Sequence, residues 1–71
     1  MRSEVRAQIA GSMLSHVASI GQHVKVGEVI CMTECMKTEI HVESPVDGTV
    51  TWLRSCGETI EADDVIVILD V

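Results

Sequence analysis

The sequence is almost without aromatic side chains: it has no Phe, no Tyr and a single Trp, Trp52, among 71 residues. A chain this short buries only about 60% of its unfolded surface, so aliphatic side chains must fill a thin core. Val, Ile and Thr are abundant, and their branched Cβ atoms favour strands over helices. The composition therefore predicts one all-β domain over residues 1–71, with no room for a second.

Positive charge is scarce as well. Five Lys and Arg residues stand against eleven Asp and Glu residues, which gives a formal net charge of −6. Nucleic acids and anionic membrane surfaces attract basic stripes, and the sequence has none. It also has no apolar run long enough for a spanning helix and no signal-peptide pattern at its start. We therefore expect no nucleic-acid partner and no membrane insertion.

Cysteines are few and odd in number: Cys31, Cys35 and Cys56. An odd count argues against a disulfide framework and favours a reducing compartment. We expect the cytoplasm, or the matrix of an organelle if the source is a eukaryote. A structural zinc site normally needs four ligands in paired clusters, and the three histidines fall at no such spacing from Cys31 and Cys35. The sequence therefore predicts no metal site.

What the sequence does contain is an internal repeat. Residues 21–33 read GQHVKVGEVICMT and residues 57–69 read GETIEADDVIVIL, so the two copies are offset from residue 21 to residue 57, by 36 positions. The copies differ at one turn, where Asp63 replaces Gly27. Two half-domain copies predict a pseudo-two-fold arrangement in which neither half buries its apolar face alone.

Each copy has the pattern of a strand, a turn, a short strand, a second turn and a longer strand. Residues 38–43 alternate between apolar and polar side chains, whereas residues 65–69 are continuously apolar, as expected of a strand covered on both sides. Together these patterns predict an all-β fold of eight strands. The expected strands cover residues 4–9, 14–19, 23–25, 28–34, 38–43, 49–54, 58–60 and 64–70.

The joint between the copies breaks local rules. Strand patterns run up to and away from Met36-Lys37, which predicts a hairpin whose two-residue loop is Met-Lys. Such loops normally use Asn-Gly, Asp-Gly or Gly-X, because one or both central residues take a positive φ. The hairpin also sets Glu34 opposite Glu39, a like-charge pair. A lone lysine in a turn is usually a solvated charge. A turn whose residues are unfavourable for its conformation, with no stabilising contact in return, is nevertheless a candidate functional site.

The repeat also predicts where Lys37 lies. A shift of 36 positions carries residue 37 to residue 1 or to residue 73, just beyond residue 71. The pseudo-two-fold counterpart of the hairpin tip is therefore the pair of chain ends. We expect Lys37 at one pole of the domain and the termini at the other, a layout suited to a module tethered by its ends.

The segment Glu34-Cys35-Met36-Lys37 closely resembles the Glu-Ala-Met-Lys or Glu-Ser-Met-Lys signature of biotinyl carrier domains, in which the lysine is biotinylated. Residues 44–50, SPVDGTV, resemble that family's Ala-Pro-Val-Asp-Gly segment. Glycine-plus-acid turns at residues 27–28 and 57–58 also fit. The resemblance extends from about Val5 to Leu69, nearly the whole chain.

The resemblance implies a flattened β-barrel or sandwich of two four-stranded antiparallel sheets with quasi-two-fold symmetry. It implies an amide between Lys37 and biotin, formed by a biotin–protein ligase that reads Met36, with Cys35 and Glu34 as flanking motif positions. It implies a carrier without catalytic residues, serving the biotin carboxylase and carboxyltransferase subunits or domains of a biotin-dependent carboxylase or decarboxylase.

The sequence departs from the family pattern at three positions: Cys35 replaces Ala or Ser, Thr38 replaces a common Met, and Gly11 stands where many members have Pro.

Lipoyl domains resemble biotinyl domains in fold and tip lysine, but typically have Asp before the lysine and Ala after it. Met36 therefore favours biotin over lipoate. The alternatives are a lipoyl carrier of a 2-oxo acid dehydrogenase-type complex and an unmodified interaction domain. No paired carboxylates, Cys–His pair or phosphate loop favours an enzyme.

Overall fold

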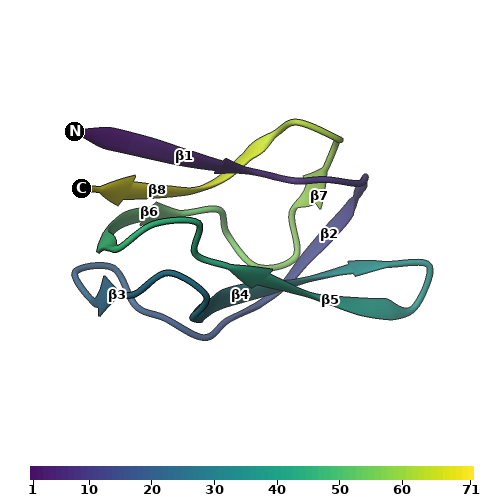
Figure 1. The fold of residues 1–71 in the computed structure, drawn as a ribbon. Coiled ribbons are helices and arrows are strands. Elements are labelled where there is room, and N and C mark those ends of the chain that lie inside the picture. The colour runs from purple at the N-terminus through teal and green to yellow at the C-terminus, as the bar shows by residue number, and fades with distance from the viewer.

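Two antiparallel sheets of four strands each form the molecule (Figure 1). The computed structural model describes residues 1–71. The strand order is β1-β8-β6-β3 in one sheet and β5-β4-β2-β7 in the other. The strands are β1 (Arg2–Arg6), β2 (Gly11–His16), β3 (His23–Val24), β4 (Val29–Cys35), β5 (Thr38–Glu43), β6 (Gly48–Leu53), β7 (Thr59–Ile60) and β8 (Val65–Asp70). This architecture confirms the predicted fold class. No helix capable of crossing a membrane is present.

Six of the eight strands lie within one residue of their predicted bounds, but the first two do not. Strand β1 ends at Arg6 rather than at residue 9, because the Ala7 N–H donates to the Asp64 carbonyl and the chain then turns. Strand β2 begins at Gly11 rather than at residue 14, because Gly11 pairs with Ile60 of β7. Both errors come from partners distant in sequence, which a local pattern does not reveal.

The core lies between the two sheets and is entirely aliphatic and sulfur-containing. Its buried apolar residues are Ala7, Met13, Ala18, Val24, Ile30, Cys31, Val50, Leu53, Ile60, Ile66, Val67 and Leu69. The prediction that β8 is covered on both sides is wrong for Val65 and Ile68, which are only half-buried. In a two-layer sandwich the outer face of each sheet meets solvent, and Ile68 pairs there with Trp52.

The sequence repeat has a counterpart in the hydrogen bonds. The Ser19 N–H donates to the side-chain oxygen of Gln22, and 36 positions later the Ser55 N–H donates to Glu58. In the opposite direction, the N–H of Gln22 donates to the Ser19 carbonyl, and that of Glu58 to the Ser55 carbonyl. The two halves therefore turn by the same local mechanism, as the pseudo-two-fold prediction requires.

The turn at which the two copies differ in sequence has the same backbone conformation in both. Gly27 has a φ of 88°, and Asp63, its counterpart, has a φ of 72°. Asp tolerates the left-handed region better than most residues with a Cβ atom. The substitution in the second copy is therefore accommodated without a change of fold.

The chain ends meet at one pole of an elongated molecule measuring 32 × 18 × 18 Å. The Val71 N–H donates to the Met1 carbonyl at 2.7 Å, and the Met1 amine donates to the Val71 carbonyl at 3.0 Å. The β4–β5 hairpin projects at the other end of the long axis (Figure 1). The predicted opposition of hairpin tip and termini is confirmed.

Candidate functional site

The tip of the β4–β5 hairpin is a two-residue turn. Cys35 pairs with Thr38, which leaves Met36 and Lys37 as the loop. Met36 has a φ of 49° and Lys37 a φ of 65°. Positive φ at both central positions is the signature of a type I′ turn, which follows the right-handed twist of the flanking strands. The predicted turn is thus confirmed, built from two residues that such turns rarely use.

Glutamates flank the turn on both strands. Glu34 pairs directly with Glu39 across the hairpin, as predicted. Neither glutamate forms an ion pair. The four ion pairs of the molecule involve the cations of Met1, Arg2, Arg6 and Arg54. Like charges directly opposite each other on a sheet are destabilising. The tip therefore combines two local costs, left-handed backbone and unrelieved acidic repulsion, at one place.

The side chains of the loop itself are presented to solvent. Met36 is 93% exposed, and Lys37 is exposed as well. The Lys37 amine takes part in no hydrogen bond or ion pair. The flanking residues Glu34 and Cys35 are half-buried. The arrangement therefore offers one unengaged primary amine, suited to acylation, on a turn that leaves access from several directions.

Gly11 supports the hairpin close to its turn, a role that the sequence did not predict. Its neighbour Ser12 pairs with Glu34, and a Cβ atom added to Gly11 would overlap the carbonyl oxygen of Glu34. Strand β2 therefore approaches β4 so closely here that a Cβ atom would not fit unless the backbone shifted. An isolated glycine in a strand often marks such a close approach, which is the signal that could have found it.

The cysteines do not gather into a site. All three thiols are free, and no group of three or more His, Cys, Asp or Glu residues is placed to hold a metal ion. Burial raises the pKa of the Cys31 thiol to about 11, with a smaller contribution from Cys56. Cys31 is therefore an inert core group at neutral pH rather than a nucleophile.

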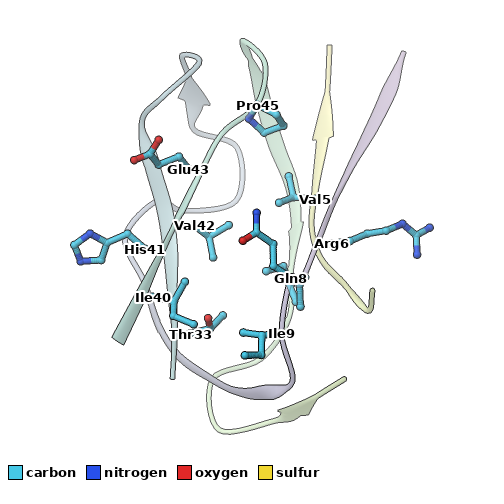
Figure 2. Close-up of a pocket in the computed structure, with 12 residues that line it drawn as sticks. Val5, Arg6, Gln8, Ile9, Thr33, Ile40, His41, Val42, Glu43 and Pro45 are labelled. Carbon is cyan, nitrogen blue, oxygen red and sulfur yellow. The ribbon is translucent and has the colours of Figure 1, made fainter. Parts of the chain in front are cut away.

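A groove of about 340 Å³ lies between the β1–β2 connection and strand β5 (Figure 2). Its lining includes four aliphatic and two polar residues, namely Val5, Ile9, Ile40, Val42, Gln8 and Thr33. The charged and imidazole groups of the rim, on Arg6, His41 and Glu43, point away from it in Figure 2. The groove could not be predicted from the sequence, because the segments around residues 9 and 40 approach each other only in the folded chain.

Residues 3–69 match the sequence model of the biotin/lipoyl attachment family, described as "Biotin-requiring enzyme". A match over nearly the whole chain, on a fold of two four-stranded sheets with a lysine at the hairpin tip, defines the class. The chain belongs to this biotin/lipoyl family.

Individual relatives agree with the family. The chain is 39% identical over 70 residues to the "Biotinylated protein TB7.3 homolog" of Mycobacterium leprae, covering 97% of this chain and 99% of that protein. It is 30% identical to pyruvate carboxylase of Staphylococcus aureus, over 96% of this chain but only 6% of that enzyme. The crystal structure of Kluyveromyces lactis urea carboxylase superposes with a TM-score of 0.92 at 27% identity, over 99% of this chain and 6% of that one.

Proposed function

We propose that this chain is a biotin carboxyl carrier in which Lys37 holds biotin through an amide bond. The observation that carries the proposal is the placement of an unengaged lysine on a left-handed two-residue turn, at the pole opposite the termini. Family membership and a biotinylated relative of the same length support biotin as the attached group. Attached biotin would carry a carboxyl group on its ureido nitrogen.

The residues of this chain then have distinct tasks. The Lys37 amine forms the amide with an activated biotin carboxyl group, releasing the activating group and a proton. Met36, almost fully exposed beside it, is the side chain best placed for a biotin–protein ligase to read, with Glu34 and Cys35 as flanks. The chain would contribute no catalytic residue of its own, only position and mobility.

The partners follow from that role. A carrier that visits a biotin carboxylase and a carboxyltransferase benefits from tethering, because effective concentration replaces tight binding. Adjacent termini at the far pole allow such tethering without obstruction of Lys37. Three free thiols fit a reducing compartment, and we place the protein in the cytoplasm or an organellar matrix on that ground.

Intact-mass measurement tests the assignment directly. The chain has only two lysines, so co-expression with a biotin–protein ligase should add one biotin to the native protein and none to Lys37→Ala. Lys25→Ala is the matched control and should be modified like the native chain. A native chain without biotin, or modification that persists in Lys37→Ala, would contradict the proposal. Exposure to a lipoate ligase in parallel distinguishes the lipoyl alternative, which predicts the opposite preference.

A further inference from the structure

The groove of Figure 2 lies within reach of the hairpin tip. Its near end is formed by Thr33 and Ile40, which pair with each other. Going from the turn, this is the third pair of the β4–β5 ladder, after Cys35–Thr38 and Glu34–Glu39. Three residues along a strand span roughly 10 Å at about 3.4 Å per residue. The groove therefore opens a short distance from Lys37, on the hairpin that presents it.

The lining combines apolar surface with unpaired polar groups. Ile9 is 48% exposed although it faces a concave surface whose apolar part includes Val5 and Val42. Thr33 is 5% exposed, yet its hydroxyl forms no hydrogen bond and retains contact with solvent. The Gln8 amide, directed toward the middle of the groove in Figure 2, is also without a partner in the molecule. Apolar walls with a few convergent polar groups are typical of a small-molecule site.

We propose that this groove is a resting site for the ring system of the biotin carried on Lys37, an inference that rests on the proposed function. The fused ring of biotin has an apolar thioether side and a polar ureido side with two N–H donors and one carbonyl acceptor. The aliphatic walls suit the thioether side. The Gln8 amide has both a donor and an acceptor for the ureido side, and the Thr33 hydroxyl offers another pairing.

Tether length and affinity are both compatible with this site. The lysine and acyl chains together form an arm of about ten bonds, roughly 13 Å when extended, because bonds of about 1.5 Å advance only about 1.3 Å each along a zigzag chain. That span exceeds the roughly 10 Å between Lys37 and the near end of the groove. A short tether gives an effective concentration on the order of 1 mM, so a site with a dissociation constant of about 1 mM would be roughly half occupied. Such occupancy shields the ring between visits without trapping it.

Methyl NMR on the intact chain tests the proposal. Mass spectrometry first establishes whether Lys37 carries biotin. Isoleucine δ1-methyl spectra of the apo and biotinylated proteins are then compared. We expect shifts at Ile9 and Ile40, with nuclear Overhauser contacts from ring protons to those methyls, and no change at Ile20, which precedes the turn at the termini pole. Unchanged Ile9 and Ile40 methyl shifts in protein that carries biotin on Lys37, without ring contacts, would overturn the resting site while leaving the carrier function intact.

Two substitutions sharpen the result. Gln8→Ala and Ile9→Ala alter exposed side chains, so the fold should persist, and each should reduce the remaining groove shifts by at least half. Ile20→Ala, an equally aliphatic and exposed change, is the matched control and should leave them unchanged. Equal shifts in all three variants would contradict the assignment of the groove. Absence of biotin from Lys37 in the native chain would instead remove the proposed function, and the resting site with it.

Discussion

At the scale of single residues, the hairpin tip has a strained backbone conformation and exposes both of its loop side chains. Left-handed backbone costs a residue with a Cβ atom roughly 1–2 kcal/mol, and Met36 and Lys37 both adopt it. Asn-Gly would form the same type I′ turn with little strain. The tip could be predicted from sequence because this conflict is local: a two-residue loop without Gly or Asn, between clear strand patterns, is visible in the letters alone.

The double substitution Met36→Asn, Lys37→Gly measures that cost. We expect the free energy of unfolding to rise by about 1–2 kcal/mol, less than the two costs together, because Asn keeps its Cβ atom and Gly loses more conformational freedom on folding. Urea denaturation followed by Trp52 fluorescence provides the measurement. Acceptance of biotin should be lost at the same time. A variant less stable than the native chain would show that Met-Lys is not strained in this turn.

Cys31 gives a second prediction at this scale. Its pKa is about 11 in the folded chain against 9.0 for an unperturbed thiol, so the folded state holds the proton more tightly than the unfolded state. The stabilisation of the folded state that this pKa difference provides is complete below pH 9. It is lost as the pH rises toward 11, and the loss is on the order of 2–3 kcal/mol. Native protein should therefore lose more stability than Cys31→Val between pH 8 and pH 11 in urea titrations. Parallel losses in both proteins would contradict this.

At the scale of elements, the repeat made most strands predictable, and long-range partners decided the rest. Strand β5 has the bounds that alternation predicts, because its own letters carry the pattern. The start of β2 depends on Gly11 pairing with Ile60, 49 positions away by subtraction of their numbers. The groove has the same origin. No local pattern encodes the approach of residues 9 and 40.

Gly11 tests the support of the hairpin by β2. Gly11→Ala should destabilise the fold by about 1–3 kcal/mol, because its Cβ atom would overlap the carbonyl oxygen of Glu34 and force the strands apart. Ser12→Ala, one residue along the strand, is the control and should change stability by less than about 1 kcal/mol. Gly48→Ala should give a smaller loss than Gly11→Ala, since its Cβ atom would lie 2.9 Å from the Asp70 carbonyl oxygen. Thermal unfolding of the three variants provides the comparison.

At the scale of the whole molecule, the long axis separates attachment from tethering. Lys37 and the termini lie at opposite poles of a body 32 Å long. A folded partner fused to either terminus should therefore leave the rate of biotin attachment unchanged within roughly twofold, because exposed ends tolerate additions. Ligase assays on both fusions, compared with the unfused chain, give the measurement. A large loss in either fusion would mean that the poles are not independent.

The meeting of the two ends has one more consequence. Strands β1 and β8 form the same kind of ladder as β5 and β4, and the bond from the Val71 N–H to the Met1 carbonyl stands where the second ladder has its turn. The chain ends therefore occupy the position that the turn occupies in the other hairpin. A circular permutant that joins the two ends through a Met-Lys turn, and has new termini at another surface turn, would carry an attachment lysine at each pole.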